Sequence, residues 1–189
     1  MVTEGLYLNG GVLVATSSVH YDTRGSFTEV FRSGRHHTHN DGFAVCQVSI
    51  AINHRGALRG LHFTDIPPGQ SKQITCIGGR LFDVIVDVRV GSPTFAHHVA
   101  LELSANDGVT VYMTPGMAHG YLALENNTSI LYLHDATYAP EYDRDLQALD
   151  PDLAIVWPNL PYLRSLKDAA APSLAESLRC DVLPSFTSY

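Results

Sequence analysis

Short apolar segments separated by turn residues fill the middle of the chain, and this pattern most constrains the fold. Turn residues such as those of Pro67-Pro68-Gly69 and Gly91-Ser92-Pro93 divide the segments from one another. Many short strands at regular spacing predict an all-β sandwich or barrel rather than a parallel βαβ sheet. The segments rich in β-branched or apolar residues are 44–52, 73–77, 81–90, 97–103, 109–113 and 129–135.

Local signals refine this prediction at two places. Asp107-Gly108, between the segments 97–103 and 109–113, predicts a β-hairpin. A helix is expected only near the C-terminus, over 173–179, where Ser173 and Glu176 have the spacing of a capping box. Because no linker, repeat or low-complexity tract interrupts the chain, we expect one domain over residues 1–189.

Composition limits the classes of function. Hydrophobic residues make up 45% of the 189 residues and charged residues 16%, which is typical of a globular protein with a substantial core. The formal charge of −7 disfavours nonspecific binding to nucleic acid or to an acidic membrane. An anionic ligand would therefore need a local cluster of cations.

Cysteine usage and hydropathy bear on the compartment. The three cysteines, Cys46, Cys76 and Cys180, are odd in number and lack CxxC spacing, so reduced thiols are expected. No signal-peptide pattern and no apolar run of membrane-spanning length is present. We therefore expect a cytoplasmic protein.

Charged and titratable side chains stand out within one apolar segment. Arg59 and His62 flank Gly60-Leu61, and Lys72 follows ten residues after His62. Two cations beside an imidazole would suit a site that binds an anion and moves a proton. The alternative interpretation is a surface strand with scattered basic groups.

Histidine spacing does not favour a metal site. His36, His37 and His39 lie in polar sequence that is typical of an exposed loop, and only the last two would share one face of a strand. Metal-binding jelly rolls usually place two histidines two residues apart on one strand, whereas Thr64 stands two residues after His62. We expect no metal.

Other residues could complete a proton-transfer site, each with an ordinary alternative. Asp150 could orient His62 or form an Asp-Pro turn, and Tyr132 could be a core tyrosine. His119 lies in a segment of small residues that predicts a turn. Arg24 could contact a phosphate or pair with Glu29.

Several motifs in order resemble the dTDP-4-dehydrorhamnose 3,5-epimerase family, the RmlC-like cupins. The resemblance extends over about residues 10 to 175. Its motifs are residues 22–25 (DTRG), 58–63 (LRGLHF), 82–95 (FDVIVDVRVGSPTF), 115–121 (PGMAHGY), 138–141 (YAPE), 150–158 (beginning with Asp-Pro and ending with Trp-Pro) and 167–172 (KDAAAP).

The resemblance implies a fold and an activity. The fold would be a metal-free, cupin-type double-sheet jelly roll, with short helical segments near the C-terminus and usually a homodimer with an exchanged N-terminal strand. The substrate would be a dTDP-4-keto-6-deoxyhexose, epimerised at C3, C5 or both by proton exchange next to the C4 ketone, without a cofactor. Removal of a proton by a base and its return on the opposite face suit such groups.

The resemblance also implies roles for individual residues. In the catalytic set, His62 matches the general base, Asp150 its carboxylate partner, Tyr132 the acid on the far face, and Lys72 the group that stabilises the enolate oxygen. The expected binding set consists of Arg59 and His119 near the sugar or diphosphate, Gln47 and Tyr138 at the nucleotide, with Tyr138 stacking on thymine, Ser49 as a further substrate-binding residue, and Arg24 and Glu29 reaching the neighbouring subunit's nucleotide.

Departures from the family pattern leave the substrate open. His20, Ser49, Ala51 and Leu133 stand where relatives commonly have an aromatic residue, Asn, Ser and Lys. These changes indicate the branch that makes deoxysugars for antibiotics and other glycosylated natural products. The alternatives are a mono-epimerase at C3 or C5, a ketoisomerase of the same sugar class, and a non-catalytic sugar-nucleotide-binding cupin.

Overall fold

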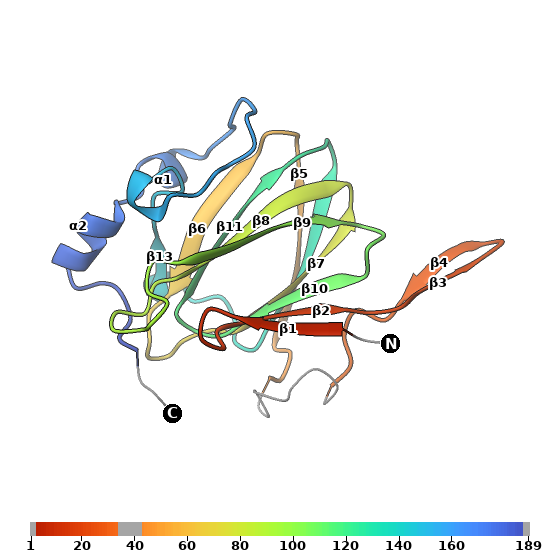
Figure 1. Cartoon of the computed structure of the whole chain (residues 1–189), viewed down its shortest axis with the longest axis horizontal. Coiled ribbons are helices and arrows are strands. Elements are labelled where there is room, and N and C mark those ends of the chain that lie inside the picture. The colour runs from red at the N-terminus through yellow and green to blue at the C-terminus, as the bar shows by residue number, and fades with distance from the viewer. Residues whose placement is uncertain (1–2, 34–42, 187–189) are drawn as a thin grey trace.

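Two antiparallel sheets face each other in the computed structural model, which describes residues 3–33 and 43–186 (Figure 1). The six-stranded sheet has the order β1-β2-β10-β7-β12-β5. Its strands are β1 (Thr3–Tyr7), β2 (Val12–Thr16), β10 (Val109–Met113), β7 (Lys72–Gly78), β12 (Thr128–His134) and β5 (Gln47–Asn53). This architecture confirms the predicted all-β, double-sheet jelly roll.

The five-stranded sheet has the order β13-β6-β11-β8-β9. Its strands are β13 (Asp143–Asp145), β6 (Leu58–Thr64), β11 (Met117–Ala123), β8 (Arg80–Asp87) and β9 (His98–Ser104). A separate hairpin of β3 (Val19–Asp22) and β4 (Gly25–Thr28) projects from the body (Figure 1). The six strands expected from sequence are therefore confirmed, with shifted ends.

Apolar side chains alternate along the strands because successive residues point to opposite faces of a sheet. One core lies between the sheets and includes Ile74 and Ile130 from one sheet and Leu81 and Ile85 from the other. Val84 and Val86 instead belong to a second core with Trp157. Polar residues that share a strand face with the residues of the first core therefore point into the space between the sheets.

The C-terminal segment covers the five-stranded sheet on its side away from the six-stranded sheet (Figure 1). It contains the 3₁₀ turns η1 (Pro140–Tyr142) and η2 (Pro151–Leu153) and the helices α1 (Leu166–Ala169) and α2 (Leu174–Arg179). Ser173 and Glu176 form the predicted capping box of α2. In the described part of the chain, no helix is long and apolar enough to span a bilayer.

Two local predictions are wrong. Asp107-Gly108 does not close a hairpin, because β9 belongs to one sheet and β10 to the other. Gly108 has φ +69° and packs against Ser17, whose amide donates to its carbonyl at 2.9 Å. His119 lies in β11 and not in a turn. The register of β11 against β6 places it opposite His62.

Candidate active site

The imidazole of His62 lies beside a buried carboxylate. Its Nε2 is 2.7 Å from Oδ1 of Asp168, whose side chain is 7% exposed. The other oxygen of Asp168 accepts from the Ser165 hydroxyl at 2.8 Å, which fixes the carboxylate. Asp168 lies in α1, so the C-terminal segment supplies the partner of a histidine on β6.

This geometry corrects the prediction that Asp150 pairs with His62. One oxygen of Asp150 accepts from the amide of Asp152 at 3.0 Å, and the other accepts from the amide of Leu174 at 2.6 Å. Because Asp150 is buried at the start of η2, its carboxylate satisfies the amide donors of two helical segments. The structural interpretation of the Asp-Pro sequence was the correct one.

A second carboxylate and an ammonium extend the charged network. Asp145 Oδ1 lies 3.5 Å from His62 Nε2 and 3.0 Å from Lys167 Nζ, and Lys167 also contacts Asp143 at 2.9 Å. Burial opposes the charge of Lys167, but its hydrogen bond to Asp143 and its ion pair with Asp145 raise the pKa of the ammonium. Ligand atoms of His62, Asp145 and Asp168 lie within 4.8 Å of one another, close enough for a metal, although Lys167 already neutralises Asp145.

Glycine at position 60 allows the close approach of β6 and β11. Gly60 has φ +91°, and a Cβ at this position would lie 2.6 Å from the carbonyl oxygen of His119. The register between the strands shifts next to this point, and His62 remains opposite His119. His119 in turn contacts the fully buried Asp83 at 2.7 Å through Nε2.

The facing sheet contributes Lys72, Tyr132 and His134. Tyr132 packs against the core between the sheets and makes an edge contact with His119, with ring centroids 6.1 Å apart. Burial raises the pKa of the Tyr132 phenol well above its ordinary value, so the phenol is protonated at neutral pH. Burial also lowers the pKa of Lys72, although the charge of Asp143 opposes this effect.

His134 is a site residue that the sequence reasoning missed. Its ring is stacked on that of Tyr132, with centroids 5.8 Å apart and planes 8° apart. The register places it opposite Lys72, and burial together with the Lys72 charge lowers its pKa to about 4. An i, i+2 relation to Tyr132 was the available signal, since both residues then share one face.

Arg59 and Tyr121 are joined through Asn53, and Tyr121 lies next to Tyr132. Arg59 Nε donates to Asn53 Oδ1 at 2.8 Å, and the Tyr121 hydroxyl donates to the same oxygen at 3.1 Å. The rings of Tyr121 and Tyr132 both contact His119, with centroids 6.0 and 6.1 Å from the imidazole, and Tyr121 adds to the effect of burial in raising the pKa of the Tyr132 phenol. The sequence reasoning included Arg59 and Tyr132 but gave no role to the two residues between them.

Gln47 and Tyr138, both expected at the nucleotide, form a separate small cluster with Ser49. The Gln47 amide donates to the Ser49 hydroxyl at 3.1 Å, and its carbonyl oxygen accepts from the backbone amide of Tyr138 at 2.8 Å. The Tyr138 ring is 61% exposed and is therefore available for stacking. The fold thus brings together three residues that lie up to 91 positions apart in the chain.

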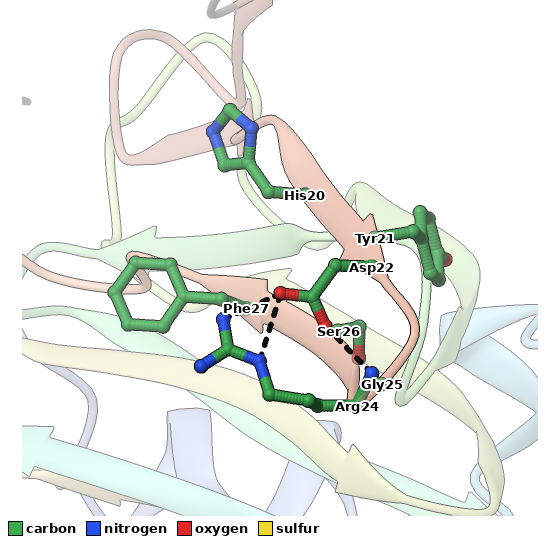
Figure 2. Close-up of a pocket in the computed structure, with 7 residues that line it drawn as sticks. All are labelled: His20, Tyr21, Asp22, Arg24, Gly25, Ser26 and Phe27. Atoms are coloured by element: carbon green, nitrogen blue, oxygen red, sulfur yellow. Dashed lines mark hydrogen bonds and ion pairs between the residues drawn. The ribbon is translucent and has the colours of Figure 1, made fainter.

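Arg24 lies on the projecting hairpin, where it lines a surface hollow of about 500 Å³ with its neighbours (Figure 2). Its guanidinium pairs with Asp22 at 2.5 Å, while Glu29 pairs with Arg32. Of the two alternatives for Arg24, the pairing with Glu29 is therefore wrong. This hollow shares no lining residue with the His62 site. His36, His37 and His39 lie outside the described residues.

Known proteins resemble this chain over most of its length. A dTDP-4-dehydro-6-deoxyglucose 3-epimerase of a Streptomyces species is 43% identical, and the match covers 90% of this chain and 88% of the relative. A dTDP-4-dehydrorhamnose 3,5-epimerase of Mycobacterium tuberculosis is 41% identical, with coverage of 93% and 83%.

Solved structures agree with these relatives. NovW, a 4-keto-6-deoxy sugar epimerase from the novobiocin biosynthetic gene cluster of Streptomyces spheroides, superposes with a TM-score of 0.93 at 34% identity, covering 98% of this chain and 94% of NovW. ChmJ, a 3'-monoepimerase from Streptomyces bikiniensis in complex with dTDP-quinovose, has a TM-score of 0.87 at 39% identity, covering 93% and 89%. The family model for dTDP-4-dehydrorhamnose 3,5-epimerase matches residues 8–176, and the chain belongs to that family.

Proposed function

We propose that the protein epimerises a dTDP-4-keto-6-deoxyhexose at one or both carbons next to the C4 ketone, without a cofactor. The observation that carries this proposal is the placement of His62 and Tyr132 on the facing sides of two sheets. An epimerase must remove a proton from one side of a carbon and return one from the other. A base on one sheet and an acid on the other meet this requirement.

His62 is the proposed base. When its Nε2–H donates to Asp168 at 2.7 Å, Nδ1 keeps its lone pair and can accept a proton from carbon. Asp168 then takes the orienting role that sequence had given to Asp150. The carboxylate also stabilises the imidazolium that forms when the proton arrives.

Lys72 and Tyr132 act on the developing enolate from the facing sheet. The Lys72 ammonium stabilises the negative charge on the C4 oxygen while the C–H bond breaks. Tyr132, protonated at neutral pH, then donates its phenolic proton to the carbon from the side opposite His62. Inversion results when the two proton transfers occur on opposite sides.

The binding residues divide by position. Arg59 and His119 hold the sugar or diphosphate beside His62, while Gln47, Ser49 and the exposed Tyr138 hold the nucleotide. Arg24 and Glu29 belong to the region of the projecting hairpin and contact the nucleotide of a neighbouring subunit. Guanidinium groups suit phosphate recognition because of their paired donors.

A homodimer accompanies this arrangement. The edge strand β5 exposes Val48, Ile50 and Ile52 at 57%, 59% and 66%, and a second copy would cover this apolar row. We further propose that residues 1–189 act as one domain in the cytoplasm, in a pathway to a deoxysugar of a natural product. A partner subunit would also receive the hairpin that carries Arg24.

The test is incubation with dTDP-4-keto-6-deoxyglucose in deuterated water, with the incorporated deuterium located by NMR. Label at C3 and C5 supports a double epimerase, and label at one carbon supports a mono-epimerase. The ketoisomerase alternative predicts a product whose carbonyl has moved to C3. Binding of the nucleotide sugar with no label and no new product would overturn the proposal in favour of a non-catalytic binder.

Substitution of His62 tests its role as the base. His62→Ala should abolish deuterium incorporation while affinity for dTDP stays nearly unchanged, because the nucleotide cluster at Tyr138 does not include His62. Incorporation that survives this substitution would remove His62 from the role of base.

A further inference from the structure

Tyr121 lies between the proposed acid and a fixed hydrogen-bond acceptor. It is 2% exposed, its hydroxyl donates to Oδ1 of Asn53 at 3.1 Å, and its ring and that of Tyr132 both contact His119, with centroids 6.0 and 6.1 Å from the imidazole. Tyr121 also lies close enough to Tyr132 to add to the effect of burial in raising the pKa of its phenol. The Asn53 amide is itself held because its Nδ2 donates to the carbonyl of Thr128 at 3.0 Å. The Tyr121 hydroxyl therefore has two neighbours to which its single proton can be donated.

Arg59 gives Asn53 a second donor. Its Nε donates to Asn53 Oδ1 at 2.8 Å, so this oxygen keeps a hydrogen bond when the Tyr121 proton turns elsewhere. A buried acceptor left without a donor would oppose such a turn. The guanidinium also places a positive charge near both tyrosines, and this charge favours the ionised form of each.

We infer that Tyr121, supported by Asn53 and Arg59, is a positioning residue that stabilises the Tyr132 phenolate formed during reprotonation of the sugar carbon. This inference rests on the proposed function of Tyr132. No contact between Tyr121 and the substrate is required, since Tyr121 acts through the oxygen of Tyr132. The three residues come from β5, β6 and β11, and Tyr132 from β12, so the network joins the two sheets.

The proton movements balance. Before the transfer, Tyr132 carries its phenolic proton and Tyr121 donates to Asn53. The Tyr132 O–H bond breaks as the enolate carbon forms its new C–H bond, and the electron pair remains on the Tyr132 oxygen. The Tyr121 O–H then turns from Asn53 to the phenolate, while Arg59 continues to donate to Asn53. Solvent reprotonates Tyr132, and His62 releases its extra proton to solvent.

Tyr121→Phe tests the inference because it removes one hydroxyl from a buried ring. With dTDP-4-keto-6-deoxyglucose in deuterated water, two rates are measured by NMR: exchange at the carbon and inversion of that carbon. Loss of one hydrogen bond to a charged oxygen should slow inversion by about 10- to 100-fold. Exchange through His62 should stay within about threefold of wild type.

Tyr112→Phe is the matched control. Tyr112 is a buried tyrosine that packs with Leu13, Phe43 and Leu133, away from the core between the sheets. This variant should exchange and invert at wild-type rates. Thermal unfolding of both variants identifies any general loss of folding.

Several outcomes would overturn the inference. Inversion at the wild-type rate in Tyr121→Phe would show that the hydroxyl is not used. A parallel fall in exchange and inversion, or an equal fall in Tyr112→Phe, would assign Tyr121 a structural role only. A wild-type protein that neither exchanges nor inverts would instead refute the proposed function, and with it this inference.

Discussion

Asp168→Asn tests how much the carboxylate contributes to the base. In wild type, one oxygen of Asp168 contacts His62 Nε2 at 2.7 Å and the other accepts from Ser165 at 2.8 Å. In the variant, the asparagine oxygen should remain toward Ser165, which turns the NH₂ group toward His62. The tautomer of His62 that accepts at Nε2 and carries its proton on Nδ1 would then be favoured, which lowers the fraction of His62 whose Nδ1 is free to act as the base.

The expected loss follows from the contact that is removed. A hydrogen bond to a charged group contributes about 1.5–3 kcal/mol. At about 1.36 kcal/mol for each tenfold change in rate, deuterium exchange should slow by about 10- to 150-fold. Asp145, at 3.5 Å from the same nitrogen, keeps some negative charge nearby and limits the loss.

The assay is the rate of deuterium incorporation next to the ketone, measured by NMR at saturating substrate. Asp145→Asn is the matched control and should have the smaller effect, because its contact with His62 is longer. An Asp168→Asn variant within threefold of wild type, with an inactive Asp145→Asn variant, would refute the assignment of Asp168 as the orienting carboxylate. The double variant then measures how far the two carboxylates depend on each other.

Three further changes test the remaining geometry. Asp150→Ala should lower the free energy of unfolding by about 1 kcal/mol or more in urea titrations, because it removes the acceptor for the Leu174 amide. Deuterium exchange into the substrate should persist in this variant. Loss of this exchange without loss of stability would restore the pairing of Asp150 with His62. Because the folded-state pKa of His134 is about 4, below that of the unfolded chain, the free energy of unfolding should fall as pH decreases from about 6.5 toward 4. His134→Gln should flatten this pH dependence. An unchanged pH dependence in the variant would contradict the lowered pKa of His134. Ile50→Glu should shift the protein from dimer to monomer in light scattering, because its side chain is 59% exposed on the edge strand, and a persistent dimer would exclude this face from the interface.

Local sequence determined much of the secondary structure for identifiable reasons. β-branched and apolar runs predicted β5, β7, β8, β9, β10 and β12, because such residues pack well on half-buried sheets. The Ser173–Glu176 spacing predicted the start of α2 through two local hydrogen bonds. In each case the interactions that decide the element lie within a few residues.

Where strands pair, the same local reasoning failed. Asp107-Gly108 has the composition of a hairpin turn, but β10 pairs with β2 and β7 instead of β9. His119 follows small residues that favour a turn, yet β11 is fully buried between β6 and β8. Pairing depends on which distant strands offer a complementary edge, and turn composition does not encode that choice.

In the candidate site, too, some residues were identified from sequence and one contact only from the structure. Sequence motifs identified His62, Tyr132 and Lys72 by residue type and by resemblance, and the structure places all three on the facing sides of the sheets. The partner of His62 was assigned to Asp150, although Asp168 lay within the KDAAAP motif of the same resemblance. Both are acidic residues of the C-terminal segment, so only their position in space distinguishes them.

By itself, the sequence determined the family, the strand-rich composition and the chemical types of the reacting groups, because these follow from residue identity and order. Tertiary structure decided which groups meet. It brought Asp168 to His62 across 106 positions, and it placed His134 opposite Lys72 on the neighbouring strand. It also joined Arg59 to Tyr121 through Asn53 and brought Tyr121 next to Tyr132. Contacts of this kind depend on sheet register and on the path of the C-terminal segment, which are set by the packing of the whole chain.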